Sequence, residues 1–327
     1  MKKERLFLEG VQLSFLFMSI LVGALLPIQT ALNAQMRSIL KSPFLASLCS
    51  FTIGTIFLAL LVLLSGDCLF LSKQQVSTLP LWAYLGGLLG MLGLTANILL
   101  FPVLGSVQTV IMPILGQLLM SLLIDQFGWF HAKIHSFSLF RAFGTIGLII
   151  GVLLVVFFPQ YFRQEKQMKY VDPVKTKSKF QFLWQLVGIG AGMLMSSQVA
   201  INGYLGRQIG SSVHAAFISF FVGTILVCLA VCFERSWPNI RQVKFTNIPP
   251  WLWLAGMLGA GYVFCNAFLA PKIGTGAIVT LALVGQILSS MTIDQFGLLG
   301  AVQKKIKAIQ LLGLAILFIG VLFIEIF

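Results

Sequence analysis

The chain has 327 residues, of which 58% are hydrophobic and only 9% are charged. Soluble domains typically carry about 25% charged residues, so this composition excludes a soluble protein and indicates an integral membrane protein. The net charge of +13 does not indicate nucleic-acid binding, because the basic residues lie almost entirely between the apolar runs, where they flank membrane spans.

The first half of the chain predicts five membrane-spanning helices, since a helix of about 20 apolar residues crosses a bilayer. They cover residues 11–34, 43–64, 81–100, 106–124 and 137–158. The first is predicted to be a retained helix rather than a signal peptide, because it is long enough to span. Residues 101–105, with Pro102 and Gly105, predict a tight turn between the third and fourth helices.

The second half repeats this organisation. Residues 159–181 are polar and lysine-rich and predict a linker, so the chain divides into repeats at residues 1–158 and 182–327. The helices of the second repeat are predicted at residues 182–205, 212–233, 250–269, 275–293 and 308–327, with a turn at 270–274.

An internal duplication explains this organisation. At a constant shift of 169 residues, Gln29 and Asn33 fall on Gln198 and Asn202, and the segment SFTIGTI at 50–56 falls on SFFVGTI at 219–225. Matching leucines would mean little in an apolar chain, whereas matching glutamines, asparagines, aspartates and tryptophans indicate a repeat.

Each repeat has an odd number of crossings, so the second repeat enters the membrane from the opposite face. The sequence therefore predicts an all-α integral membrane protein of ten transmembrane helices, built as two inverted-topology five-helix repeats. Lysine and arginine counts favour a cytoplasmic linker with both termini outside, whereas the basic N-terminus, with Lys2, Lys3 and Arg5, favours the reverse.

Buried amides supply most of the candidate site residues. Exposing an amide to lipid is costly, so these side chains are expected to face the bundle interior, either along a substrate path or in hydrogen bonds between helices. For Asn97 and Asn266, near helix ends, capping is a further alternative. The substrate-path candidates are Gln29, Asn33, Asn97, Gln117, Gln198, Asn202, Asn266 and Gln286.

The fourth helix of each repeat ends in the sequence IDQFG, which contains one aspartate. Gly128 and Gly297 end these phrases and predict left-handed helix termini. Asp125 and Asp294 are expected to lie at opposite membrane faces, where they either fasten the helix end or act in gating or proton coupling.

No catalytic group, metal site or cofactor is predicted. His131 and His135 are four residues apart, as two metal ligands on a helix would be, but no further ligand accompanies them. The cysteines lie scattered within apolar stretches and indicate packing.

The repeated pattern resembles a known family. G-x5-Q-x3-N in the first helix, S-F-x2-G-T in the second and G-Q-x7-D-Q-F-G closing the fourth are similar to the YdcZ-like family (formerly DUF606) of the drug/metabolite transporter (DMT) superfamily. The resemblance implies an EamA-like bundle of inverted repeats in a bacterial cytoplasmic (inner) membrane. Small multidrug-resistance relatives carry a buried glutamate in the first helix, and neither first helix here has an acid after Glu9.

These observations favour a secondary transporter of a small metabolite or drug-like solute, which works by alternating access through a cavity lined by helices one, three and four of each repeat. The partners expected are the lipid bilayer and a small-molecule solute; a coupling ion such as H⁺ and a homodimer remain open. A non-transporting scaffold or receptor is the alternative, followed by a membrane enzyme acting on lipid-linked substrates. An enzyme is disfavoured because the chain offers no acid–base or metal cluster.

Overall fold

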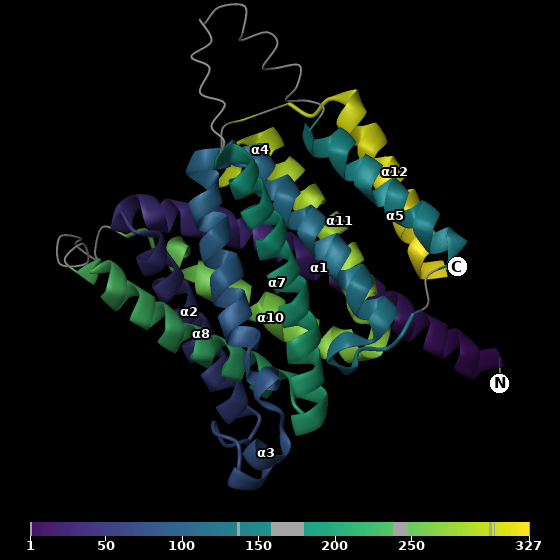
Figure 1. The fold of residues 1–327 in the computed structure, drawn as a ribbon. Coiled ribbons are helices and arrows are strands. Elements are labelled where there is room, and N and C mark those ends of the chain that lie inside the picture. Colours follow the sequence, from purple (N-terminus) through teal and green to yellow (C-terminus); the bar gives the residue numbers. More distant parts are fainter. Residues whose placement is uncertain are drawn as a thin grey trace, which may run out of the picture.

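A computed structural model describes residues 2–135, 138–157, 180–237, 248–300, 303 and 305–326, and these contain helices and no strand. The side chains described are those of residues 13–100, 112–135, 138–155, 182–237, 248–300, 303 and 305–324. The helices are α1 (Lys2–Leu40), α2 (Pro43–Leu64), α3 (Lys73–Thr78), α4 (Gly86–Phe127), α5 (Leu139–Val152), α7 (Phe180–Ile209), α8 (Ser212–Glu234), α10 (Leu254–Ile273), α11 (Thr275–Phe296) and α12 (Ala308–Ile326) (Figure 1). Short 3₁₀ helices at Leu81–Tyr84 and Pro250–Trp253 precede α4 and α10, and a π-helix at Leu153–Phe157 follows α5.

Six helical stretches are long and apolar enough to cross a membrane: Leu13–Leu40, Pro43–Leu64, Phe182–Ile209, Ser212–Glu234, Pro250–Ile273 and Thr275–Phe296. Four shorter apolar helical stretches cover Gly86–Leu100, Met112–Phe127, Leu139–Val155 and Ala308–Ile324. Each of the predicted apolar segments therefore contains a helix. The described residues confirm the predicted all-α fold, and their apolar helices agree with a membrane protein.

Equivalent residues of the two repeats begin and end equivalent helices. The hydroxyls of Ser42 and Ser211 accept backbone N–H groups at the starts of α2 and α8, so each serves as the N-cap. Gly128 and Gly297 end α4 and α11 with φ of 63° and 61°, which confirms the predicted left-handed termini.

Some predicted boundaries are wrong. Helix α1 spans 39 residues and exceeds its predicted range at both ends. The backbone is helical through residues 101–105, where the sequence predicted a turn, whereas Gly274 with φ of 92° does separate α10 from α11. The predicted linker at 159–181 lies outside the described residues except where α7 begins at Phe180.

The chain nevertheless reverses direction within α4. An added Cβ at Gly188 of α7 would lie 2.6 Å from Met112 Cβ and 3.4 Å from a Leu100 methyl. In a straight helix these two residues would be about 18 Å apart along the axis. Both arms of α4 therefore run along α7, and the predicted reversal lies between Leu100 and Met112.

The two repeats interlock rather than form separate bundles. Helix α1 of the first repeat lies along α10 and α11 of the second, and α7 of the second lies along both arms of α4. The contacts are so close that a Cβ added at Gly23 would overlap the Ala282 carbonyl, and one added at Gly192 would overlap the Pro113 carbonyl. Small residues permit this approach of helices, because association in lipid depends on close packing.

The last helices of the two repeats pair with each other. In Figure 1, α5 and α12 lie side by side at the upper right. A Cβ added at Gly144 would lie 2.7 Å from the Gly320 carbonyl oxygen, and one added at Gly313 would lie 2.9 Å from the Gly151 carbonyl oxygen. Gly313 is the equivalent of Gly144, and Gly320 is the equivalent of Gly151, 169 residues later in the chain. The two contacts are therefore equivalent, and the crossing is symmetric.

An internal two-fold axis passes between α2 and α8. The hydroxyls of Thr55 and Thr224 are 2.8 Å apart, and the ring centroids of Phe51 and Phe220 are 5.0 Å apart. In both pairs a residue meets its own equivalent in the other repeat, 169 positions away. Such a contact places the pair on the axis that relates the repeats.

Candidate functional site

A small cavity lies on this axis, at the centre of the interlocked helices. Its volume is ≈ 40 Å³. Most of its walls are equivalent residues from the two repeats. The lining residues are Leu26, Gln29, Ser50, Phe51, Gly90, Leu94, Met195, Gln198, Phe220, Gly259, Tyr262 and Val263.

The walls of this central cavity are aromatic, aliphatic and amide-bearing. None of the described lining residues carries a charge. A cavity of this volume holds water, whereas sites for drug-sized molecules enclose roughly 300–1,000 Å³. The cavity of this conformation is therefore too small for a drug-sized molecule.

Glycines give the two cavity glutamines their positions. A Cβ added at Gly259 of α10 would overlap the Gln29 amide, and one added at Gly90 of α4 would lie 2.5 Å from the Gln198 amide nitrogen. Each glutamine thus rests against a bare stretch of helix from the opposite repeat. Of the eight predicted path residues, Gln29 and Gln198 are the two that line the cavity.

Two equivalent polar clusters flank the cavity. Cluster A consists of Gln29, Asn33 and Ser50, and cluster B consists of their equivalents Gln198, Asn202 and Ser219. In cluster B the Asn202 and Gln198 amides donate to the Ser219 hydroxyl, at 3.2 Å and 3.5 Å.

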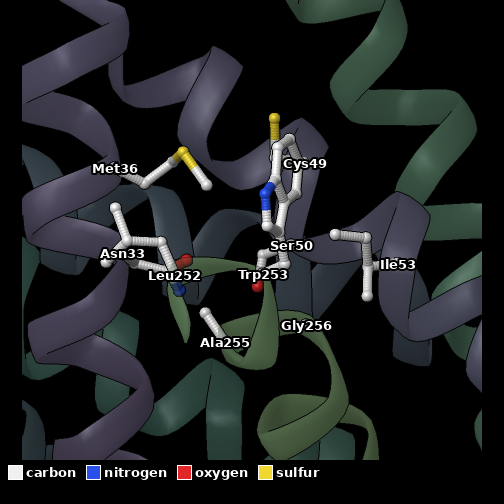
Figure 2. Close-up of a pocket in the computed structure, with 9 residues that line it drawn as sticks. All are labelled: Asn33, Met36, Cys49, Ser50, Ile53, Leu252, Trp253, Ala255 and Gly256. Carbon is white, nitrogen blue, oxygen red and sulfur yellow. The ribbon is translucent and has the colours of Figure 1, made fainter. Parts of the chain in front are cut away.

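Cluster A is arranged differently. The Asn33 amide nitrogen and the Ser50 hydroxyl are buried without a hydrogen-bond partner among the described residues. Figure 2 shows them on two sides of a narrow pocket, Asn33 with Met36 from α1 and Ser50 with Cys49 from α2. The start of α10, with Ala255, closes the pocket from below in this view.

Three other predicted path residues surround the cavity rather than line it. The amide nitrogens of Asn97 and Gln117 approach the Met195 sulfur at 3.7 Å and 3.9 Å, and Ser196 donates to the Gln117 carbonyl at 2.8 Å. Asn266 is buried one helical turn after Tyr262.

Gln286, the equivalent of Gln117, is buried on α11 with its amide nitrogen unpaired among the described residues. Neither Gln117 nor Gln286 contributes to the cavity wall. The wall comes instead from the first, second and third helices of each repeat, whereas the sequence predicted the first, third and fourth.

The Asp125 side chain contacts the opposite repeat. Its buried carboxylate accepts the Gly276 N–H at 3.1 Å and 3.2 Å, at the first turn of α11. His135 lies beside it, with Nδ1 3.6 Å from a carboxylate oxygen, and the His135 N–H donates to the Asp125 carbonyl at 2.9 Å. An acid at a helix start complements the helix dipole, so this contact favours the fastening role over the others weighed for Asp125.

Asp294 is half-buried and, like Asp125, interacts with other groups. The His131 ring stacks on Trp82 and Tyr204. Within the described part of the chain, no three histidine, cysteine or acidic side chains are grouped as metal ligands.

The serines of both clusters and the phenylalanines on the axis were not singled out from the sequence as site residues. Their signal was present in the repeated segments SFTIGTI and SFFVGTI, which carry Ser50 and Ser219 at the same position. Serine within a helix often bonds its own backbone, so an isolated serine indicates little about a site.

Comparisons with known proteins give a family and a fold. The family model DMT_YdcZ, described as "Putative inner membrane exporter, YdcZ", matches twice, at residues 14–154 and 183–323. A crystal structure of another protein aligns with this chain with a TM-score of 0.61 and 13% sequence identity. The alignment covers 94% of this chain and 96% of the other chain. The comparison with curated proteins found no match.

The two family matches are offset by the same 169 residues as the repeats, and together they cover most of the chain. The family's description points to transport rather than catalysis, and it agrees with the apolar helices. The chain therefore belongs to the DMT_YdcZ family and is a multi-pass protein of an inner membrane.

Proposed function

We propose that this protein is a secondary transporter that moves a small solute by alternating access. In this proposal the ten apolar helices all cross the bilayer, the repeats at residues 1–158 and 182–327 are inverted relative to each other, and the central cavity is the solute site. Inverted repeats characterise secondary transporters, in which the site lies near the membrane midplane between the repeats.

One observation carries the proposal: the cavity lies on the internal two-fold axis and is walled by equivalent residues of both repeats. Such a site faces two equivalent ends of the molecule. A small difference between the repeats is then enough to open one end and close the other. A receptor or scaffold gains nothing from that arrangement, and an enzyme would need reactive groups in the wall.

The cavity chemistry favours an uncharged solute with hydrogen-bonding groups and an apolar part. Burying a charge without a partner is costly, and the described wall offers none. Glutamine amides donate and accept hydrogen bonds, and Phe51 and Phe220 offer apolar ring surface. Asn97, Gln117, Asn266 and Gln286 form a surrounding layer in this proposal, where they hold the helices that carry the wall.

The test has two stages. Metabolites inside and outside cells are compared with and without the protein, and each metabolite whose distribution changes is then tested for flux in liposomes that contain the purified protein. The proposal predicts saturable flux of at least one uncharged metabolite. Conversion of a lipid-linked substrate without flux would support an enzyme. The absence of both flux and conversion would support a scaffold or receptor.

A further inference from the structure

The two polar clusters have the same residues and different hydrogen bonds. In cluster B the Ser219 hydroxyl accepts from both amides. In cluster A the Ser50 hydroxyl and the Asn33 amide nitrogen lack a partner among the described residues, although Ser50 is only 4% exposed and Asn33 only 1%. In cluster B both of these equivalent groups are paired, and the Asn202 amide oxygen is the atom without a described partner. A buried polar group without a partner costs free energy, so cluster A needs a partner that this conformation does not supply.

One sequence difference lies directly beside the clusters and favours the asymmetry. Gly86 faces cluster B, and a Cβ added there would overlap the Asn202 amide oxygen and lie 3.2 Å from the Ser219 hydroxyl. The equivalent residue facing cluster A is Ala255, which lines the pocket with Asn33 and Ser50. By equivalence, the Ala255 methyl would overlap an asparagine placed as Asn202 is in cluster B, which disfavours the same arrangement of Asn33 and Ser50.

The clusters also lie toward opposite ends of the cavity. Helices α2 and α8 are antiparallel, because Ser42 at the start of α2 bonds Glu234 at the end of α8. Ser50 and Ser219 each precede the central Thr55–Thr224 contact by five residues, so they lie about 15 Å apart along the helix pair.

The cavity touches both clusters, through Gln29 and Ser50 of cluster A and Gln198 of cluster B, but it reaches the serine of cluster A alone. Ser50 lines both the central cavity and the pocket in Figure 2, whereas Asn202 and Ser219 line neither. Ser219 and Asn202 are thus bonded to each other outside the cavity wall, whereas Ser50 forms part of that wall.

We propose that clusters A and B are alternating gates, of which one is locked by its asparagine–serine and glutamine–serine hydrogen bonds while the other, whose serine and asparagine are unpaired, is free to open. The inference rests on the proposed function. The structure then represents the conformation in which gate B is locked. In the opposite conformation, Asn33 and Gln29 bond Ser50, and Ser219 is released.

The proposal predicts opposite effects for equivalent variants. Ser219→Ala removes bonds made only in the present conformation, so it shifts the population toward the opposite one. Ser50→Ala removes bonds made only in the opposite conformation and shifts the population the other way. Ala255→Gly frees the space beside Asn33 and shifts the population in the same direction as Ser219→Ala, without removing a hydrogen bond.

Two equivalent positions report the state of the gates. Cys49 lines the pocket at cluster A, and Ile218 is its equivalent beside cluster B. In a variant without the other cysteines, either Cys49 is retained or Ile218→Cys is introduced. The rate of labelling by a membrane-impermeant cationic methanethiosulfonate is then measured in liposomes.

Ser219→Ala is expected to raise labelling of the Ile218→Cys reporter about fivefold, as loss of one net hydrogen bond implies, and to lower labelling of Cys49. Ala255→Gly is expected to change both labelling rates in the same directions. Ser50→Ala is expected to lower labelling of the Ile218→Cys reporter. The same direction of change in Ser219→Ala and Ser50→Ala, or unchanged labelling in a folded Ala255→Gly protein, would overturn the proposal.

Flux in the same liposomes separates this inference from the proposed function. If solute flux persists while the labelling rates do not respond to the variants, the gate assignment fails and transport stands. If no metabolite crosses, the transport proposal itself fails. Gly190→Ala serves as the matched control, since a Cβ added at Gly190 meets nothing within 4 Å.

Discussion

At the scale of single residues, the site depends on glycines, which have no side chain, as much as on the glutamines that contact them. Gln29 and Gln198 reach the cavity because Gly259 and Gly90 leave the facing helices bare. Their amides fill space that a methyl group would otherwise occupy. The paired glycines and glutamines therefore act as one unit, and a change in the glycine displaces the amide.

We expect Gly90→Ala and Gly259→Ala each to reduce solute flux severalfold, because the added methyl pushes a glutamine amide from its place in the wall. The measurement is initial flux in liposomes at matched protein content. Gly190→Ala is the control and keeps normal flux, since its added methyl enters open space. Normal flux in both wall variants would mean that the amides have no part in the solute path.

The Asp125 carboxylate is a second residue whose role can be tested. Asp125→Ala leaves the Gly276 N–H buried without an acceptor and is expected to reduce the free energy of unfolding by about 1.5–3 kcal/mol. Asp125→Asn keeps one acceptor oxygen and is expected to lose less. Denaturation in detergent measures both.

If Asp125→Ala proves as stable as the unaltered protein but loses the pH dependence of its flux, the fastening role is wrong and the coupling role is supported. Asp294→Asn is measured in parallel, because it is the equivalent residue of the second repeat.

At the scale of helices, glycine contacts decide which elements can meet. The α5–α12 pair crosses through Gly144 with Gly320 and Gly151 with Gly313, where backbone meets backbone. Gly147 lies on the same helix, but an added Cβ there would be 3.4 Å from the nearest atom, an ordinary contact distance. Gly144 and Gly147 thus lie on the same helix, but only Gly147 has room for an added methyl group.

Gly144→Ala is expected to destabilise the protein by about 1–3 kcal/mol, because the methyl would lie 2.7 Å from the Gly320 carbonyl oxygen and overpack the crossing. Gly147→Ala is expected to be tolerated. Melting temperatures in one detergent compare the two, and equal melting temperatures would show that the crossing is looser than the structure indicates.

Most helices could be predicted from the sequence, because apolar length is a strong signal. The boundaries of α2 agree with the prediction at both ends. At its N-terminal end Ser42 caps the helix and Pro43 begins it. The length of α1 was underestimated, because its ends are polar and lie beyond the apolar run. The helical backbone at 101–105 was also missed, since Pro102 and Gly105 usually indicate a turn.

At the scale of the whole molecule, the two repeats interlock about one axis. The first helix of each repeat packs against the third and fourth helical segments of the other repeat. The repeat itself was evident from matched polar residues. The interlocking was not, because the pattern within a repeat does not say which repeat its helices contact.

The site was predicted only in part for the same reason. Gln29 and Gln198 were identified as candidates and line the cavity, while Gln117 and Gln286 lie outside its wall. The difference between the clusters depends on Gly86 and Ala255. A search for residues that match between repeats passes over a position at which they differ.

The central claim is that solute crosses through the cavity on the two-fold axis. Its most direct test is flux, in liposomes, of the metabolite identified in cells, compared between the unaltered protein and the Gln29→Leu/Gln198→Leu double variant. Saturable flux is expected for the first, and for the folded double variant at least a tenfold lower rate, about 1.4 kcal/mol in activation free energy. Equal flux from both proteins would contradict it.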